Sequence, residues 1–267
     1  MLNTVSDLKK WHSLRKTLNG TIGFVPTMGN LHAGHLALVQ QALAENDLCL
    51  VSIFVNPTQF NDASDYEAYA RTLQEDCAKL DTLGVQYVLT PDEKAMYPDA
   101  YELQVSESKL AHVLEGEFRP GHFDGMLTVV LKLLNIASAD RAYFGEKDFQ
   151  QLRLVQKMAK AFFLPTEIVP CATLREENGL AMSSRNNRLT ADEKDKASLL
   201  YRLLCDPSLS DDDVMMRLKD EGFRPEYVAQ KWGRRLAAAW LGDVRLIDNI
   251  AFEKEPKEKD IQNVAVS

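Results

Sequence analysis

The stretch TIGFVPTMGNLHAGHLALVQQALAENDLCLVSIFV, residues 21–55, decides the fold. It opens with a short apolar run at 21–26 and closes with another at 48–55, and both have the length of buried strands. Between them, residues 34–46 place three aliphatic side chains on one face of a helix. A strand, a helix and a second strand in this order predict a parallel pair with a crossover helix.

The same alternation continues along the chain. Further strands are expected at 86–90, 141–144 and 167–171, and further helices at 64–81, 127–137 and 147–162. The first of these helices begins at a capping box, Ser64-Asp65-Tyr66-Glu67. This pattern predicts an α/β protein with a mostly parallel sheet covered by helices.

The last third of the chain has a different pattern. A second capping box, Thr190-Ala191-Asp192-Glu193, opens an expected helix, and a polar helix is expected at 210–221. The apolar stretch 236–250 indicates one or two strands. We therefore expect a first domain over residues 1–181, a smaller α+β domain over 182–251 and a charged tail over 252–267.

The composition is that of an ordinary globular protein, with 45% hydrophobic and 26% charged residues. A net charge of −8 disfavours a general nucleic-acid coat. No apolar stretch approaches the ~18 residues of a membrane span, and the first residues lack the layout of a signal peptide. The four cysteines form no C-x-x-C pair, so neither a zinc site nor a disulfide scaffold is indicated. We expect a reduced, cytoplasmic protein without nucleic-acid or membrane partners.

Ligands of parallel sheets bind beyond the carboxyl ends of the strands, so the segments there carry the candidate chemistry. The first is PTMGNLHAGH, residues 26–35, where a helix N-terminus offers free N–H groups to phosphates. Gly29 and Gly34 permit close backbone approach, and His32 and His35 can donate to phosphate oxygens. The simpler interpretation is a loop with two surface histidines or an accidental metal pair.

Two further segments carry cations. GEKDFQQ, residues 145–151, places Lys147 at an expected helix N-terminus, with Gln151 one turn along the same face. MSSR, residues 182–185, offers two hydroxyls and the guanidinium of Arg185, which suit phosphate oxygens. A capped helix start and a polar linker are the simpler interpretations.

Two more segments have residues that suit a small polar substrate or an anion. FVNPTQF, residues 54–60, carries the uncharged Asn56 and Gln59, and RPGHF, residues 119–123, is a basic loop. Each alone is explained by a turn. Taken together, the segments predict a nucleoside triphosphate site, without a P-loop, in which the α-phosphate is attacked. The side chains expected to converge on it as cations are His32, His35, Lys147 and Arg185.

Seven blocks of sequence carry a family resemblance. They are PTMGNLHAGH, SIFVNPTQF, RTLQEDCAKL, LEGEFRPGHF, FGEKDFQQL, GLAMSSRN and LGDVRLIDN, in this order over residues 20–250. They resemble the pantothenate synthetase, or pantoate–β-alanine ligase, family of the H-x-G-H nucleotidyltransferase superfamily. The resemblance implies a Rossmann-like sheet and a homodimer. It implies that pantoate and ATP, with Mg²⁺ on the phosphates, form a bound pantoyl adenylate, which the amine of β-alanine converts to pantothenate and AMP.

The resemblance also implies site residues. Those implied for ATP are Met28, Gly29, Asn30, Leu31, His32, Ala33, Gly34, His35, Gly145, Glu146, Lys147, Asp148, Leu174, Met182, Ser183, Ser184 and Arg185. Those implied for pantoate are Gln59 and Gln151, with Gln59 also near β-alanine and with Asn56, Tyr69, Arg119 and His122 as further candidates. Those implied for catalysis are His35, His32, Lys147 and Arg185, with His35 a proton donor in the family. Those implied near magnesium are Glu75 and Asp76. From the chemistry, we expect the two imidazoles to stabilise charge more than they move protons.

Two departures from the family pattern stand out. The usual Tyr-Pro-Arg-Thr reads Tyr69-Ala70-Arg71-Thr72, and losing the proline should loosen this loop. The stretch between Arg185 and Asn249 is shorter than usual, which predicts a trimmed second domain that acts as a lid.

Two other functions compete with this one. An H-x-G-H nucleotidyltransferase acting on a phosphate-bearing acceptor would need additional cations, whereas Gln59 and Gln151 favour a small hydroxy acid. A non-catalytic nucleotide-binding scaffold would be expected to have lost the charged residues of the site, which are all present.

Overall fold

The computed structural model describes residues 2–60 and 66–252. Of these residues, 2–60, 66–175 and 182–184 form one compact unit, and 176–181 and 185–252 form a second. The boundary expected at Met182 falls in the stretch where the chain changes unit, and the expected tail lies outside the described residues after Phe252. Among the described helices, none is both long enough and apolar enough to span a bilayer.

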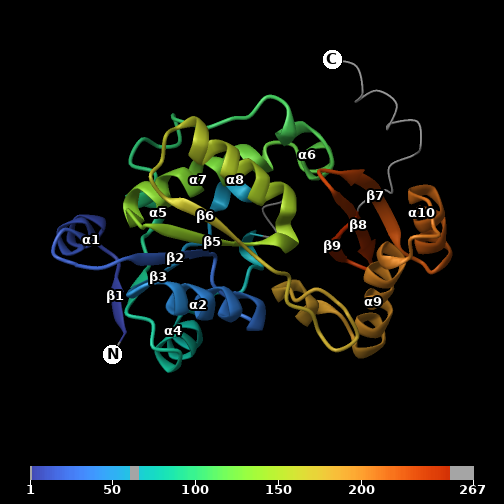
Figure 1. Ribbon diagram of the computed structural model, residues 1–267, viewed down its shortest axis with the longest axis horizontal. Coiled ribbons are helices and arrows are strands. Elements are labelled where there is room, and N and C mark those ends of the chain that lie inside the picture. Colours follow the sequence, from blue (N-terminus) through green and yellow to red (C-terminus); the bar gives the residue numbers. More distant parts are fainter. Residues whose placement is uncertain (1, 61–65, 253–267) are drawn as a thin grey trace, which may run out of the picture. The chain divides into compact units, whose positions relative to one another are not determined.

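A six-stranded parallel sheet forms the centre of the first unit (Figure 1). Its strands are β1 (Asn3–Val5), β2 (Ile22–Thr27), β3 (Leu48–Ile53), β4 (Tyr87–Leu89), β5 (Arg141–Gly145) and β6 (Glu167–Cys171). Their order across the sheet is β1-β4-β3-β2-β5-β6, and every pairing is parallel. The predicted sheet is confirmed, with β1 as a strand that the sequence pattern did not indicate.

The strand order changes direction at β2. From β2 the chain moves outward to β3 and β4, and it later returns to place β5 on the other side of β2. In open parallel sheets, ligands bind beyond the carboxyl ends of the strands at such a reversal. The loops that follow β2 and β5 are therefore the first places to look for a site.

Helices cover both faces of this sheet (Figure 1). One face carries α2 (Ala33–Glu45) and α4 (Leu73–Thr82), and the other carries α1 (Leu8–Arg15), α7 (His122–Ala137) and α8 (Phe149–Ala161). The shorter elements are α5 (Glu93–Met96), α6 (Glu115–Phe118) and the 3-10 turns η1 (Pro57–Gln59), η2 (Leu110–His112) and η3 (Glu146–Asp148).

Alternation along the strands supplies a separate core on each face. Ile22 and Phe24 of β2 are fully buried with Leu127 of α7, whereas Val25 is buried with Val39 of α2. Successive side chains of a strand point to opposite faces, so one short strand anchors both layers. The carboxyl ends of the central strands are therefore held firmly from both faces.

The helix expected over residues 64–81 is interrupted, because residues 66–67 are helical but the next regular helix begins only at Leu73. Ser64 and Asp65 of the predicted capping box lie outside the described residues, and residues 68–72 are not helical. None of residues 68–72 is buried, so no packed face holds them in a helix. The helix α4 starts directly after Thr72, whose hydroxyl donates to the carboxylate of Asp76.

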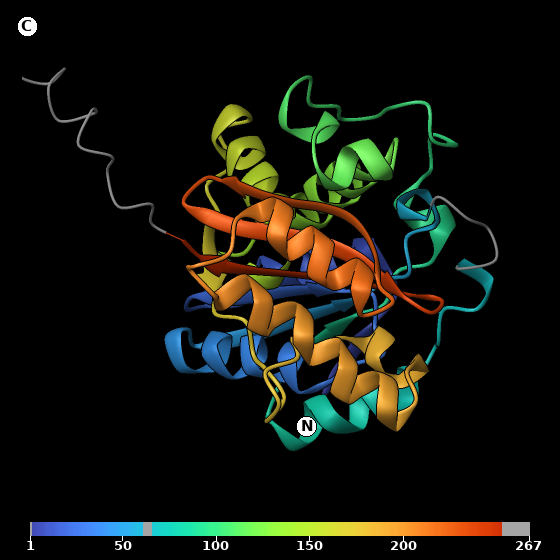
Figure 2. The same ribbon diagram turned by 90° about the vertical axis from the view of Figure 1, so that its right-hand side faces the viewer.

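The second unit is a three-stranded antiparallel sheet with two helices on one face (Figures 1 and 2). Its elements are η4 (Ser184–Arg188), α9 (Ala191–Cys205), α10 (Asp211–Asp220), β7 (Arg224–Lys231), β8 (Arg234–Leu241) and β9 (Val244–Ala251). The predicted capping box opens α9, since Thr190 and Glu193 each bond the backbone N–H of the other. Two-residue turns join the strands, so this small α+β unit contains little loop.

One buried arginine ties this sheet to its helices. Arg235 is 0% exposed, and its Nε donates to Asp211 Oδ1 at 2.9 Å. Its terminal N–H groups donate to the carbonyls of Leu204, Asp206 and Leu209 at 3.4, 3.1 and 2.6 Å. These carbonyls lie between the end of α9 and the start of α10, where backbone groups lack helical partners.

Replacing Arg235 with methionine keeps the length of the side chain and removes its donors. We expect Arg235→Met to lower the free energy of unfolding by about 3–5 kcal/mol, because Asp211 and the three carbonyls lose a buried cation. Urea denaturation followed by circular dichroism measures this change. Arg234→Met, next to it and partly exposed, is the control, and a loss below about 1 kcal/mol for Arg235→Met would contradict the assignment.

Candidate active site

The loop after β2 turns sharply before α2 begins. Gly29 has a φ of +78° and Asn30 a φ of +52°. A Cβ on Gly29 would lie 3.0 Å from Ile53 Cγ2, and the Gly29 N–H donates to Thr27 Oγ1 at 3.1 Å. The left-handed backbone and the close approach require glycine at this position, and asparagine tolerates the same conformation.

Both histidines of the loop take part in the N-terminal cap of α2. His32 Nδ1 accepts the Gly34 N–H at 3.1 Å, and His35 Nδ1 accepts the His32 N–H at 3.4 Å. The centroids of the two rings lie 4.1 Å apart. Since each Nδ1 accepts a hydrogen bond, each neutral ring carries its proton on Nε2. The helix cap therefore provides two N–H donors.

The environment keeps both imidazoles neutral. Burial lowers the pKa of His32 to about 4 and that of His35 to about 3, and the nearby Lys147 ammonium contributes to both shifts. The expectation that these residues act as cations is therefore wrong for the ligand-free protein at pH 7. Neutral Nε2–H groups still donate to phosphate oxygens.

Gly34 explains the spacing of the H-x-G-H motif. A Cβ on Gly34 would lie 2.9 Å from Cε1 and 3.0 Å from Nδ1 of His32. Glycine leaves the space into which the His32 ring folds to cap the helix. The motif thus describes a particular helix start and not a metal pair.

Lys147 lies in η3, directly after β5. Its Nζ is 4.0 Å from Asp148 Oδ2, and its side chain is 20% exposed. The contribution of its charge to the lowered pKa values of both histidines places it near them. A Cβ on Gly145 would meet nothing within 4 Å, so the end of β5 borders open space. The β2 and β5 loops thus bring two neutral donors and one ammonium to the same edge of the sheet.

Arg119 and His122 hold the backbone at the end of η1. The carbonyl oxygen of Gln59 accepts from His122 Nδ1 at 2.8 Å and from Arg119 at 3.4 Å, and Arg119 also donates to His122 Nε2 at 3.1 Å. Burial lowers the pKa of His122 to about 4, with the Arg119 guanidinium as a further cause. Both nitrogens of His122 are therefore used within the protein. The side-chain amide of Gln59 has no hydrogen-bond partner among the residues that the structure describes.

Asn56 does not fit its expected role as a substrate ligand. It is 1% exposed, its Oδ1 accepts from the Tyr97 hydroxyl at 2.6 Å, and its Nδ2 donates to the Gly125 carbonyl at 3.2 Å. This amide ties the end of β3 to α7. Tyr69, another expected contact, packs its ring edge-on against Phe60 at 5.6 Å between centroids.

Two adjacent glutamines at the start of α8 have different tasks. Gln150 is 2% exposed, donates to the carbonyls of Leu110 and Val113, and accepts from the Glu115 N–H. Gln151 is partly exposed and makes no hydrogen bond within the described part of the chain. Of this pair, only Gln151 keeps its amide available for a ligand.

Leu174 and Met182 lie beside the start of α2. The Met182 N–H donates to the Leu174 carbonyl at 3.0 Å, and the Leu174 side chain is 41% exposed. Met182 Cβ is 3.5 Å from where a Cβ on Gly34 would lie. Residues 183–184 belong to the same unit, whereas Arg185 belongs to the second.

Asp76 does not fit a magnesium site, whereas the exposed Glu75 stays a prediction. Asp76 is 0% exposed, and its two oxygens accept the N–H groups of Asn30 and Leu31 at 2.8 Å each. Lys79 Nζ lies 3.9 Å from Asp76 Oδ1, where it supplies positive charge. No cluster of three or more His, Cys, Asp or Glu side chains within residues 2–60 and 66–252 could hold a metal ion. The N–H groups of Asn30 and Leu31, expected at the phosphates, face Asp76 instead, and the only sequence signal for this pairing is an acid in the first turn of α4.

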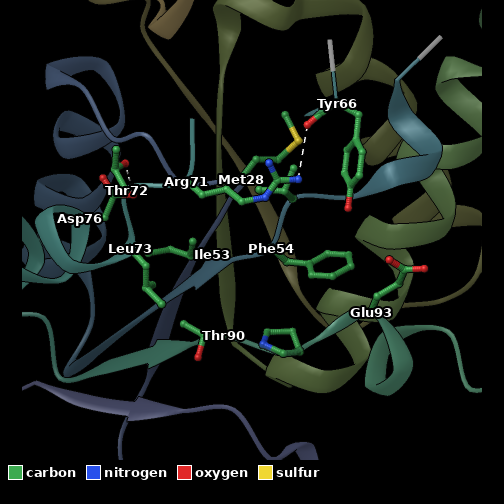
Figure 3. A pocket seen from close by; sticks show the side chains of 13 residues that line it. Met28, Ile53, Phe54, Tyr66, Arg71, Thr72, Leu73, Asp76, Thr90 and Glu93 are labelled. Carbon is green, nitrogen blue, oxygen red and sulfur yellow. Dashed lines mark hydrogen bonds between the residues drawn. The ribbon is translucent and has the colours of Figure 1, made fainter. Parts of the chain in front are cut away.

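A cavity of about 300 Å³ opens at the same edge of the sheet, beside β3 and β4 (Figure 3). Met28 lines it together with Phe54, Arg71 and Thr90. Arg71, in the segment without the family's proline, donates to the Tyr66 carbonyl at 3.4 Å and lies 5.0 Å from the centroid of that ring. The guanidinium thus contacts the backbone of residues 66–69, within its own segment.

Sequence comparisons identify one family. The profile of the family described as Pantoate-beta-alanine ligase matches residues 1–251. A pantothenate synthetase of Coxiella burnetii (strain RSA 493 / Nine Mile phase I) is 48% identical, covering 96% of this chain and 100% of its own. One of Bdellovibrio bacteriovorus is 48% identical, covering 94% and 98%.

Solved structures show the same likeness. A pantoate-beta-alanine ligase from Francisella tularensis, complexed with beta-gamma ATP and beta-alanine, has a TM-score of 0.90 and 42% identity, covering 96% of this chain and 100% of its own. A pantothenate synthetase from Thermus thermophilus has a TM-score of 0.85 and 38% identity, covering 93% and 99%. Coverage this complete means that these relatives have a second unit of similar extent.

The variant Gly34→Ala tests whether the geometry of the helix cap affects nucleotide binding independently of the stability of the helix. We expect this variant to bind a nucleoside triphosphate about tenfold more weakly or worse, because the added Cβ displaces the His32 ring. Stability should fall little or rise, since alanine favours a helix by about 1 kcal/mol over glycine. Calorimetric titration and thermal unfolding measure the two effects.

Ala44→Gly is the matched control for this variant, because it reverses the propensity change at an exposed position of the same helix. It should lower stability and leave nucleotide binding unchanged. Unaltered binding by Gly34→Ala would contradict the role given to the cap.

The three partly buried histidines should stay neutral across the physiological range. Their folded pKa values of about 4, 3 and 4 for His32, His35 and His122 lie below the ordinary 6.5. As the pH falls below 6.5 the unfolded chain binds protons first, so the stability they contribute is complete above 6.5 and is lost toward about pH 3. NMR titration of the ligand-free protein, with each histidine replaced in turn for assignment, checks this. A signal from any of them that titrates near 6.5 would refute it.

Proposed function

Because the chain belongs to the pantoate-beta-alanine ligase family, we propose that it condenses pantoate with β-alanine to give pantothenate, converting ATP to AMP and pyrophosphate. One observation carries this proposal beyond family membership. The neutral imidazoles of His32 and His35 and the ammonium of Lys147 gather at the edge where β2 and β5 end. Preoriented donors with one cation suit a triphosphate on which charge shifts during attack.

The proposed reaction runs through a pantoyl adenylate. A carboxylate oxygen of pantoate attacks the α-phosphorus of ATP, and the bond from that phosphorus to the pyrophosphate oxygen breaks. The amine nitrogen of β-alanine, after its ammonium gives one proton to solvent, then attacks the acyl carbon. The bond from that carbon to the AMP oxygen breaks, and the nitrogen gives a second proton to solvent as the amide forms. The mixed anhydride already carries a good leaving group, so positioning and charge stabilisation suffice and no protein nucleophile is needed.

The two histidines would act as hydrogen-bond donors in this reaction. Each Nε2–H is proposed to donate to a phosphate oxygen, and Lys147 to offset the charge that develops on the leaving pyrophosphate. A pKa of about 3 for His35 in the ligand-free protein argues against a proton stored on it before ATP binds. The N-terminus of α2 adds the positive end of its dipole.

Pantoate is proposed to bind through the amides of Gln59 and Gln151, with β-alanine approaching near Gln59. This is supported by the two side-chain amides, which have no hydrogen-bond partner within the described residues, and by the fixed backbone at Gln59. An amide both donates and accepts, which matches the hydroxyls and carboxylate of a hydroxy acid.

The remaining assignments rest on the family resemblance. ATP contacts are proposed for Gly145–Asp148, Leu174 and Met182–Arg185, and magnesium is proposed to arrive bound to the phosphates of ATP. A cytoplasmic homodimer is also proposed. A molar mass by light scattering of twice the chain mass of 30.1 kDa would support the dimer. The family and the relatives described above are named pantoate-beta-alanine ligase or pantothenate synthetase, so neither transfer to a phosphate acceptor nor a non-catalytic role is proposed.

Exchange of labelled pyrophosphate into ATP, measured without β-alanine, tests the intermediate. We expect exchange only when pantoate is present, because reversal of adenylate formation is the step that reincorporates pyrophosphate. When β-alanine is added, ¹⁸O from the carboxylate of pantoate should appear in AMP by mass spectrometry. Formation of ADP, or exchange without pantoate, would contradict the adenylate route.

Gln151→Ala is the substrate-side control in this assay. The pantoate concentration for half-maximal exchange should rise about tenfold, while that for ATP changes little, because a hydrogen-bonding site loses a partner for one substrate only. An equal rise in the half-maximal concentrations of pantoate and ATP would contradict the assignment of Gln151 to the pantoate site.

A further inference from the structure

The loop that precedes the histidine cap is built around the buried carboxylate of Asp76, which Figure 3 shows beside Thr72. Asp76 Oδ2 accepts the Asn30 N–H at 2.8 Å, and Oδ1 accepts the Leu31 N–H at 2.8 Å. The hydroxyl of Thr72 donates to Oδ2 at 3.0 Å. Successive N–H groups in a turn form a concave anion site, and here the protein's own carboxylate fills it.

These bonds hold a backbone conformation that is unfavourable by itself. Asn30 has a φ of +52°, and it follows Gly29 at +78°. A Cβ on Gly29 would lie 3.1 Å from Asp76 Oδ2, so the carboxylate sits directly against the turn. Side-chain-bearing residues adopt such angles at a cost, and neighbouring interactions must offset it.

Lys79 holds the same turn by bonding the carbonyl of Leu31. Its Nζ donates to the Leu31 carbonyl at 2.8 Å and lies 3.9 Å from Asp76 Oδ1. Leu31, whose N–H is held by Asp76, immediately precedes the N-cap His32. Both backbone polar groups of the residue before the cap are therefore bound by α4.

Charge gives Lys79 a second task. An isolated carboxylate behind a phosphate-binding loop would repel a triphosphate, and a neighbouring ammonium offsets that repulsion. The positive charge of Lys79 also reaches the histidines, since it contributes, after burial and Lys147, to their lowered pKa values.

We propose that Asp76 and Lys79 form a positioning pair for ATP. Asp76 fixes the turn at residues 29–31 and thereby sets where the Nε2–H groups of His32 and His35 point, while Lys79 holds the turn and cancels the repulsion from Asp76. The pair acts through the loop and touches no substrate. This inference rests on the proposed ATP site.

The test is direct binding of a non-hydrolysable ATP analogue by calorimetry. Asp76→Asn keeps the shape of the side chain but cannot accept both N–H groups, and Lys79→Met leaves the carboxylate uncompensated. We expect each to raise the Kd for the analogue about tenfold or more. Glu102→Gln removes a charge from an exposed position of the same unit and should leave the Kd unchanged.

Ionic strength separates the two members of the pair. The loss in Lys79→Met should shrink as salt rises, because screening weakens the repulsion, whereas the geometric loss in Asp76→Asn should persist. When Asp76→Asn is already present, adding Lys79→Met should raise the Kd by a smaller factor than it does in the parent protein. The reason is that the carboxylate charge that Lys79 offsets is gone. A Lys79→Met loss that is independent of salt and additive with Asp76→Asn would overturn the electrostatic part.

Further readouts distinguish positioning from general support of the fold. Nitrogen NMR should show Nε2–H tautomers for His32 and His35 in the parent and a mixture in Asp76→Asn, while the Kd for pantoate stays within about twofold. If Asp76→Asn does not fold, Thr72→Val replaces it in the test. This variant removes one donor to Asp76 and should lose less ATP affinity than the value expected for Asp76→Asn. Unchanged ATP affinity with unchanged tautomers, or parallel loss of pantoate and ATP affinity, would overturn the proposal.

These measurements do not depend on turnover. A parent protein that binds the analogue and makes no pantothenate would refute the proposed function and leave this test intact. If the parent did not bind the analogue, the ATP site itself would fail, and the tautomer signals would still report whether Asp76 sets the two rings.

Discussion

The pairing of β2 with β3 on one side and β5 on the other is the constraint on which the site depends. A strand hydrogen-bonded on both edges and packed on both faces cannot shift, so the loop at its end starts from a fixed point. The same pairing brings Lys147, which follows β5, to the histidines that follow β2. The fold thus assembles the candidate site before any ligand contributes.

Electrostatic balance at this edge is local. The chain carries a net charge of −8, yet the groups at the proposed phosphate site include two neutral imidazoles, the Lys147 ammonium beside the Asp148 carboxylate, and the Asp76 carboxylate held close to Lys79. Burial removes the charge from the histidines and leaves their donors aligned by the helix cap. Such a site meets a polyanion with few charges in fixed directions, which suits charge that moves during reaction.

Much of this could be predicted from the sequence, and the misses share a cause. The strands from β2 to β6, the helix cap at Thr190, and the segments carrying His32, Lys147 and Gln151 follow from local pattern. The prediction was wrong where partners lie far away in the chain. Asn56 is turned inward by Tyr97, 41 residues later, and the helix expected from residue 64 lacks a packed face before Thr72.

By itself the sequence determined the order of the elements, the family, and which loops carry donors and cations, because periodicity, capping and motif spacing are properties of neighbouring residues. Only the tertiary structure decided what state those residues are in. The neutrality of His32 and His35 comes from burial, and the turn before them is held by Asp76, which is 45 residues from Leu31. The protonation state of a side chain and the direction in which it points depend on the groups that surround it in space. Those surroundings exist only once distant segments of the chain have packed together.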